Sequence, residues 1–292
     1  MAKIDYEKYL VRKPLYEAFG GTKNRQSPTM TMMSNKQVPG VNYYLEPGWI
    51  YGIPDPNPSL HEHVHEYDEI VMHWGGHPET PQVLGGEVEF YLDGQPIVFN
   101  TATFLYVPKG TPHGPVIWKK FGFPHMQMAM MIGTGSAGEA WEESGIHETK
   151  DKLPDKTRIF DYERYVVRSP VREKGADGAL TYMSSLQVPG INYHIEFGWI
   201  TAQTASRIEG IKEMAHRDAD EIILDLGSDP ANPEDLGAEM EFLLGGQVLT
   251  FNTTSALFIP RGVKHRPLRY KEFRKPHMFL AIMCGAGSIS GR

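Results

Sequence analysis

The residues best suited to chemistry form a dense group of imidazoles and carboxylates at positions 60–69, which read LHEHVHEYDE. In a β-strand alternate side chains share a face, so His61, His63 and His65 can all point to one side. Two imidazoles at i and i+2, a carboxylate four residues later and a histidine from a distant strand can converge on one divalent metal. The predicted metal ligands are therefore His63, His65, Glu69 and, after a strand-ending proline and a glycine bend, His113.

An internal repeat organises the chain. The segment QVPGVNYYLEPGWI at 37–50 returns as QVPGINYHIEFGWI at 187–200, and the pattern Pro-x-Gly-x-x-His ends at both His113 and His265. Such spacings mean that one ancestral domain was duplicated. We expect two domains, residues 1–150 and 151–292. A polar linker is expected near 141–156, and its segment 139–144 is expected to form one short helix.

Each copy is predicted to be all-β. Short apolar runs such as 88–92 and 96–99 flank a turn pair, Asp93-Gly94, and the second copy has Gly245-Gly246 at the same place. Turn residues of this kind between alternating runs are typical of hairpins. Short strands that recur between glycines and prolines favour a sandwich or a small barrel.

The motifs of the first copy resemble those of the cupin superfamily. His63, His65, Glu69 and Gly76 fit its first motif, and Pro108, Gly110 and His113 fit its second. The resemblance covers most of both repeats and implies a bicupin, with two tandem jelly-roll barrels and a short helical linker. It further implies that three histidines and one glutamate hold a divalent ion. A competing interpretation makes the histidine run a solvated polar strand without a metal.

The second copy keeps only part of the ligand set. Met214 stands where the first histidine is expected, while His216, Glu221 and His265 could form a weaker three-ligand site. Two imidazoles and a carboxylate can hold a metal with open positions. The alternative is that this barrel, as in many duplicated proteins, serves as a scaffold.

Other histidines have two interpretations each. His125 and His277 follow a proline in the strand after the second motif, where an acid–base catalyst or a partner of the metal ligands could lie. The same Pro-His pair could simply cap a strand, and our catalytic candidate is His125. His61 is expected at the entrance or as a spare donor, and His73 is expected in the core.

Composition excludes several function classes. A net charge of −7 argues against a nucleic-acid partner, because phosphate binding requires clustered Lys and Arg. The apolar stretches are strand-sized, which argues against a membrane span. The start of the sequence shows no apolar signal core, and its one cysteine, Cys284, excludes an internal disulfide; both favour the cytoplasm.

A homo-oligomer, most simply a dimer, is expected because barrel edges are usually covered, and the repeated leaders at 5–12 and 161–168 could act as covers.

The resemblance to cupins implies reactions such as dioxygenation, decarboxylation and isomerisation of small oxygen-rich molecules. We therefore expect a metal-dependent enzyme that acts on a small organic acid, phenolic or sugar-derived substrate. The three-His, one-carboxylate set favours Fe or Mn and dioxygenase chemistry, although Zn, Ni and Co accept the same ligands. An isomerase, lyase or decarboxylase is the closest alternative. A non-catalytic, metal-stabilised binding protein for a small molecule is the second hypothesis. The methionine-rich strand at 126–131 could line a dry pocket or pack the core.

Overall fold

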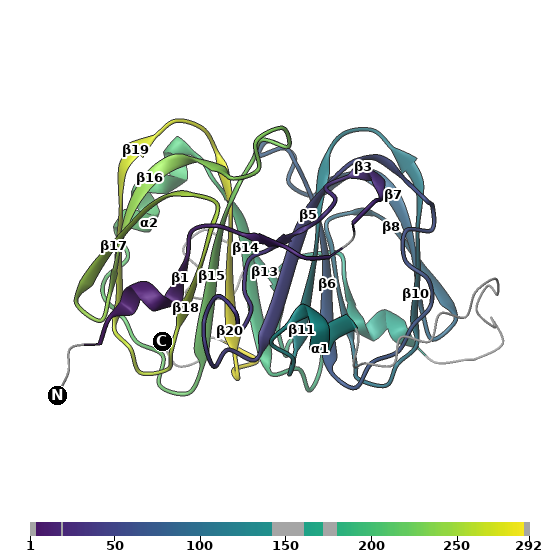
Figure 1. Ribbon diagram of the computed structural model, residues 1–292, viewed down its shortest axis with the longest axis horizontal. Helices are drawn as coiled ribbons and strands as arrows, with labels where there is room; N and C mark the ends of the chain where they lie inside the picture. Colours follow the sequence, from purple (N-terminus) through teal and green to yellow (C-terminus); the bar gives the residue numbers. More distant parts are fainter. Residues whose placement is uncertain (1–3, 19, 142–160, 172–179, 289–292) are drawn as a thin grey trace. The chain divides into compact units, whose positions relative to one another are not determined.

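The computed structural model describes residues 4–18, 20–141, 161–171 and 180–288. These residues form two compact units, one of residues 15–169 and one of residues 1–14 with 170–292. We call them the N-terminal barrel and the C-terminal barrel. Each consists of a six-stranded and a three-stranded antiparallel sheet (Figure 1), which confirms the predicted all-β fold of tandem jelly-roll barrels.

The N-terminal barrel contains a six-stranded sheet of order β12-β9-β6-β11-β5-β3, a three-stranded sheet of order β10-β7-β8 and the small β2-β4 pair. Its elements are β2 (Leu15–Tyr16), β3 (Lys23–Arg25), β4 (Met30–Thr31), β5 (Tyr43–Asp55), β6 (Asp68–Gly75), β7 (Val83–Leu92), β8 (Gln95–Thr101), β9 (Thr103–Val107), β10 (His113–Phe121), β11 (His125–Ile132), α1 (Ala137–Trp141), η2 (Tyr162–Tyr165) and β12 (Val166–Val167).

The C-terminal barrel repeats this plan, with sheets of order β1-β18-β15-β20-β14-β13 and β17-β16-β19. Its elements are η1 (Tyr6–Tyr9), β1 (Leu10–Val11), β13 (Leu180–Met183), β14 (Tyr193–Ile200), α2 (Ala202–Glu209), β15 (Asp220–Gly227), β16 (Asp235–Leu244), β17 (Gln247–Thr253), β18 (Ser255–Ile259), β19 (His265–Phe273) and β20 (His277–Cys284).

The predicted hairpins form because their turn residues tolerate positive φ. Asp93 and Gly94 have φ of 46° and 77°, and they join β7 to β8. Both values match the turn whose twist fits that of the flanking strands. Along β8, Ile97 and Phe99 point into the barrel core while Val98 between them is exposed, which is the alternation of a strand with one buried face.

The two leaders are exchanged between the copies. The first leader adds β1 to β18 of the C-terminal barrel, with Leu10 opposite Leu257, and the second adds β12 to β9 of the N-terminal barrel. The Tyr162 hydroxyl donates a hydrogen bond to Asp93 over 2.8 Å, and its ring joins the core of the N-terminal barrel. Each leader thus covers a sheet edge. The compact units are divided after residues 14 and 169, whereas a single boundary after residue 150 was expected.

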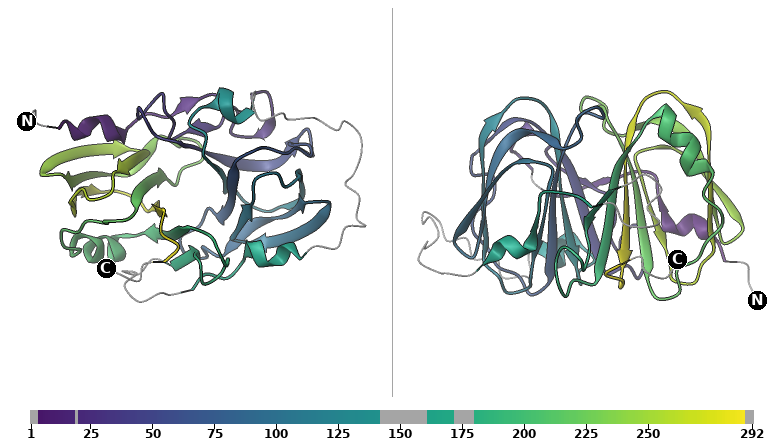
Figure 2. Two further views of the ribbon diagram at one scale, coloured as in Figure 1. Left: turned by 90° about the horizontal axis from the view of Figure 1, so that it is seen from below. Right: turned by 180° about the vertical axis from the view of Figure 1, so that it is seen from behind.

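The helices differ in part from expectation. The predicted linker helix begins earlier, as α1 at 137–141, and the rest of the linker at 142–160 lies outside the described residues. The helix α2 was not predicted. It begins after Thr201, whose side chain and that of Thr204 cap each other's backbone N–H groups, and it packs beside β19 (Figure 2). In the first copy β5 instead continues as a strand to Asp55.

We predict that the leader exchange is needed for the stability of each barrel separately. Replacing Tyr162 by alanine should cost about 3 kcal/mol, because a buried aromatic ring is lost from the N-terminal barrel. Hydrogen exchange should then rise in β9 and stay unchanged in β18. Tyr162→Phe, which removes only the bond to Asp93, is the control and should lose much less. Loosening of β18 instead would contradict the exchange.

Candidate metal centre

Backbone pairing brings the predicted ligands of the N-terminal barrel together. His63 and His113 form an isolated antiparallel bridge, with both N–H···O contacts at 2.9 Å. The Pro-x-Gly loop docks on the same segment, since the Gly110 N–H donates to the His65 carbonyl over 2.8 Å. Gly110 has φ of +71°, a conformation that glycine adopts without strain. Glu69 lies near the start of β6, opposite Met131 of β11.

The four side chains converge inside the barrel. One ligand atom from each lies within 4.8 Å of the others, and all four residues are buried. The Glu69 Oε2 atom lies 3.2 Å from Nε2 of His65 and 3.0 Å from Nε2 of His113. The structure therefore assembles the group His63, His65, Glu69 and His113 that the sequence nominated.

Each imidazole is oriented by a backbone carbonyl two residues away. The Nδ1 atom of His63 lies 3.0 Å from the His61 oxygen, that of His65 lies 2.7 Å from the Tyr67 oxygen, and that of His113 lies 2.9 Å from the Thr111 oxygen. A carbonyl can only accept, so Nδ1 carries the proton and Nε2 keeps its lone pair. This arrangement is the one that metal-ligating histidines require.

The electrostatics of the group fit a cation. Burial would raise the pKa of Glu69, but His113 and His65 hold it well below its usual range. Burial, with His113 beside it, lowers the pKa of His63 to about 3. The Nε2 atom of His113 is buried and makes no hydrogen bond in spite of its closeness to Glu69. A neutral His63 imidazole and an ionised Glu69 carboxylate are the protonation states that a divalent metal selects.

The second copy brings three donors together. Oε2 of Glu221 lies 3.3 Å from Nε2 of His216 and 3.1 Å from Nε2 of His265, and all three atoms are buried without a hydrogen bond. Met214 pairs its backbone with His265 as His63 does with His113. The predicted difference between the copies is therefore present in the structure: the second copy has the thioether side chain of Met214 at the position of the His63 imidazole.

A buried arginine that the sequence analysis assigned to no site lies next to this second cluster. Arg266 directly follows His265, at the place of Gly114 in the first copy, and it holds φ of +69°, which is strained for a side chain other than glycine. Burial would raise the pKa of Glu221, but His216, His265 and, to a smaller extent, the charge of Arg266 lower it. Burial raises the pKa of Asp225 to about 7, with Arg266 opposing the effect.

The structure does not bring His125 to the candidate metal ligands. It pairs with Gly75, six residues along β6 from Glu69, which corresponds to about 20 Å at the rise of a strand. Its Nε2 atom accepts a hydrogen bond from Trp118 Nε1 over 3.1 Å. His277 takes the equivalent place in the C-terminal barrel, beside Tyr270 and 3.7 Å from Asp225. His73 is fully buried, as the core interpretation expected.

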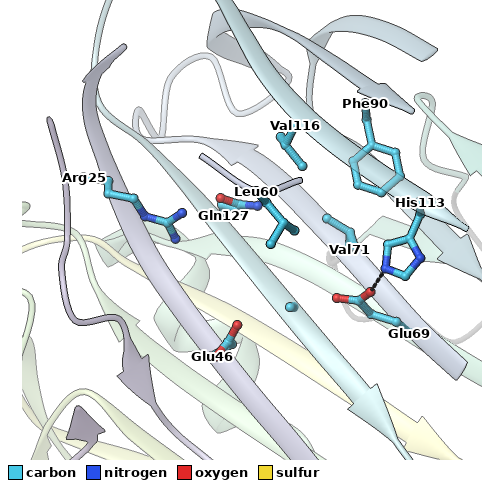
Figure 3. A pocket seen from close by; sticks show the side chains of 10 residues that line it. Arg25, Glu46, Leu60, Glu69, Val71, Phe90, His113, Val116 and Gln127 are labelled. Atoms are coloured by element: carbon cyan, nitrogen blue, oxygen red, sulfur yellow. Dashed lines mark ion pairs between the residues drawn. The ribbon is translucent and has the colours of Figure 1, made fainter. Parts of the chain in front are cut away.

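A pocket in the N-terminal barrel reaches two of the candidate metal ligands (Figure 3). Glu69 and His113 form one end, and Arg25, Glu46 and Gln127 form the other. The walls between them are apolar and consist of Leu60, Val71, Phe90, Val116 and Ala129. The residues of the polar end were not predicted from the sequence. Glu46 offered one signal, since it returns as Glu196 in the repeat, whereas nothing marked Arg25 or Gln127.

Trp118 tests whether His125 has a structural role. Replacing Trp118 by phenylalanine removes the N–H donor and leaves a buried nitrogen without a partner, so it should cost about 1–3 kcal/mol of unfolding free energy. The metal content should not change. Adding His125→Phe should recover part of the loss, because both polar partners are then gone. Loss of metal in Trp118→Phe would contradict this assignment.

Asp225 should make stability depend on pH. Its pKa rises from 3.8 when unfolded to about 7 when folded, so the folded state binds more protons between these values. Its contribution to the unfolding free energy is therefore lost as pH rises across that window. In Asp225→Asn this loss should disappear, and urea unfolding at about pH 5 and about pH 7 measures it. An equal pH dependence in both proteins would contradict the assignment.

Comparison with known proteins finds similar structures but no match by sequence. No protein-family model and no curated protein matches the sequence. Among solved structures, AerE from Microcystis aeruginosa is 11% identical, with 95% of this chain and 99% of that chain covered and a TM-score of 0.54. A point mutant of Bacillus subtilis oxalate decarboxylase is 10% identical, with 88% and 72% covered and a TM-score of 0.53.

A further oxalate decarboxylase structure is 11% identical, covers 94% of this chain and 80% of its own, and has a TM-score of 0.56. Within the part of the chain that the structure describes, no helix is both long and apolar enough to cross a membrane. The similarity extends over both barrels, and the cluster of His63, His65, Glu69 and His113 lies where the sequence motifs placed it. The chain thus has the bicupin fold: two cupin-type jelly-roll barrels, each with a His/Glu cluster inside.

Proposed function

We propose that the N-terminal barrel is the catalytic centre of a metal-dependent enzyme that acts on a small, oxygen-rich organic substrate. The proposal depends on one observation: three oriented imidazole nitrogens and a carboxylate oxygen meet at the end of a pocket. A site with only a structural role would be closed to ligands. Here Glu69 and His113 themselves line the pocket, so a ligand there reaches the ion.

The residues of the chain have distinct tasks. His63, His65, Glu69 and His113 would hold the ion, and a bound ion would supply Lewis-acid activation of a substrate oxygen or binding of dioxygen. The carbonyls of His61, Tyr67 and Thr111 keep the imidazoles in their ligating orientation. The apolar walls, Phe90 and Val71 among them, exclude water from the substrate.

The proposed ion is divalent Fe or Mn, because a set of three imidazoles and one carboxylate with room for a ligand suits them; Zn, Ni and Co accept the same donors. Oxygenation of the bound substrate remains the leading reaction. Decarboxylation is the second candidate, and the oxalate decarboxylases of the same fold support it. For the C-terminal barrel we propose a weaker metal site at His216, Glu221 and His265.

Elemental analysis tests the metal proposal. The wild type, reconstituted with Fe or Mn, should hold at least one equivalent per chain that His63→Ala/His113→Ala loses. The matched variant Met214→Ala/His265→Ala, changed at the same positions of the second copy, should retain it. Circular dichroism should show both variants folded. No metal in the reconstituted wild type would refute the proposal.

Turnover separates an enzyme from a binding protein. We expect chelation to abolish oxygen consumption or carbon dioxide release from a panel of small hydroxy, keto and phenolic acids, with the fold largely preserved. Re-addition of the ion should restore the activity. If chelation unfolds the N-terminal barrel and no acid in the panel reacts, the metal is structural and the binding-protein alternative holds.

A further inference from the structure

We infer that the substrate of the N-terminal barrel is a small monoanion, with its carboxylate at Arg25 and an uncharged oxygen at the metal centre. The inference depends on the proposed function, because it assumes a divalent ion at His63, His65, Glu69 and His113. It adds the charge of the substrate and the direction in which the substrate lies.

Arg25 is placed to meet a ligand from inside the barrel. It ends β3, lies 6% exposed and lines the same pocket as Glu69 and His113. In Figure 3 its guanidinium points toward the space between Gln127 and Glu46, at the opposite end from the metal ligands. A buried guanidinium presents a planar fork of N–H donors that matches the two oxygens of a carboxylate.

The buried charges of the pocket define the charge of its ligand. Burial lowers the pKa of Arg25 only to about 10, with Glu46 opposing the decrease, so the guanidinium stays charged. Glu46 and Glu69 are the acidic residues of the lining, and a divalent ion would add two positive charges. Since ligating imidazoles are neutral, one positive charge remains uncompensated. An unbalanced charge in an apolar interior is costly, so the pocket favours one negative charge on the ligand.

The neighbouring histidine does not change this count. Burial, together with His125 and Arg25, lowers the pKa of His73 far below its ordinary value, and the residue is neutral. The hydrocarbon walls between the two polar ends separate the charge at Arg25 from the oxygen at the metal. The ligand therefore has an acidic tail, a short apolar middle and a neutral hydroxyl, carbonyl or phenol head.

The second copy differs at one residue of this polar end. Gln127 pairs with Gly48 and His73, and the residue in the same register of the C-terminal barrel is Phe279, between Gly198 and Asp225. A side-chain amide that can donate to a carboxylate is thus replaced by a hydrocarbon ring. The second barrel has a buried arginine, Arg266, beside its His/Glu cluster.

Three compounds with the same carbon number test the charge rule. Binding of 3-hydroxypropionate, propane-1,3-diol and malonate, which carry one, no and two negative charges, is measured by calorimetry on the Mn-loaded protein at neutral pH. Metal content is checked after each titration. The wild type should bind the monoanion about tenfold or more tighter than either other compound, because each of these leaves one charge unbalanced.

Two variants should shift the preference in opposite directions. Arg25→Met leaves the pocket with no net charge and should favour the diol, whereas Glu46→Gln leaves two positive charges and should favour malonate. Lys23→Met removes an exposed charge from the same strand and should keep the wild-type order. If Arg25→Met fails to fold or to retain metal, the shift in Glu46→Gln decides.

The outcomes separate this inference from the proposed function. A wild type that binds no metal refutes both. A metal-loaded wild type that binds all three compounds equally, or a Glu46→Gln variant that still prefers the monoanion, overturns the charge rule and leaves the metal centre intact.

Discussion

The arrangement of three imidazole lone pairs around a buried carboxylate is the constraint on which the site depends. All four residues are buried, and the Nε2 atom of His113 has no hydrogen bond, so the group is suited to hold a cation. The backbone bridge between His63 and His113 sets the spacing, and carbonyls such as that of Tyr67 set the ring orientation. Local backbone structure thus positions and orients the imidazole rings of the cluster.

The two copies share the backbone arrangement of the cluster but differ in the side chains that it carries. In the second copy the backbone bridge persists at Met214 and His265, yet a thioether replaces the imidazole and Arg266 brings a fixed charge beside Glu221. In the first copy Gly114 leaves that position without a side chain, and the arginine of the pocket comes from β3. The leaders are exchanged between the copies, so each copy supplies an edge strand to the other's barrel.

Much of this could be predicted where the relevant residues are close in sequence. The sequence predicted that the four candidate ligands lie together, because a strand alternation relates His63 to His65 and a Pro-x-Gly bend positions His113. The partners of His125 were not predictable, since period-two alternation gives the face of a strand but not the distance along it. Arg25 was missed for a similar reason: β3 reaches the pocket through pairing with β5, which no local pattern reveals.

The most direct test of the central claim is anomalous diffraction at the metal edge from crystals of the Mn-loaded protein. We predict a strong peak among Nε2 of His63, His65 and His113 and a Glu69 oxygen, with the three Nδ1 atoms still donating to backbone carbonyls. A peak bound through Nδ1, or no peak in the N-terminal barrel of a fully loaded crystal, would contradict the account.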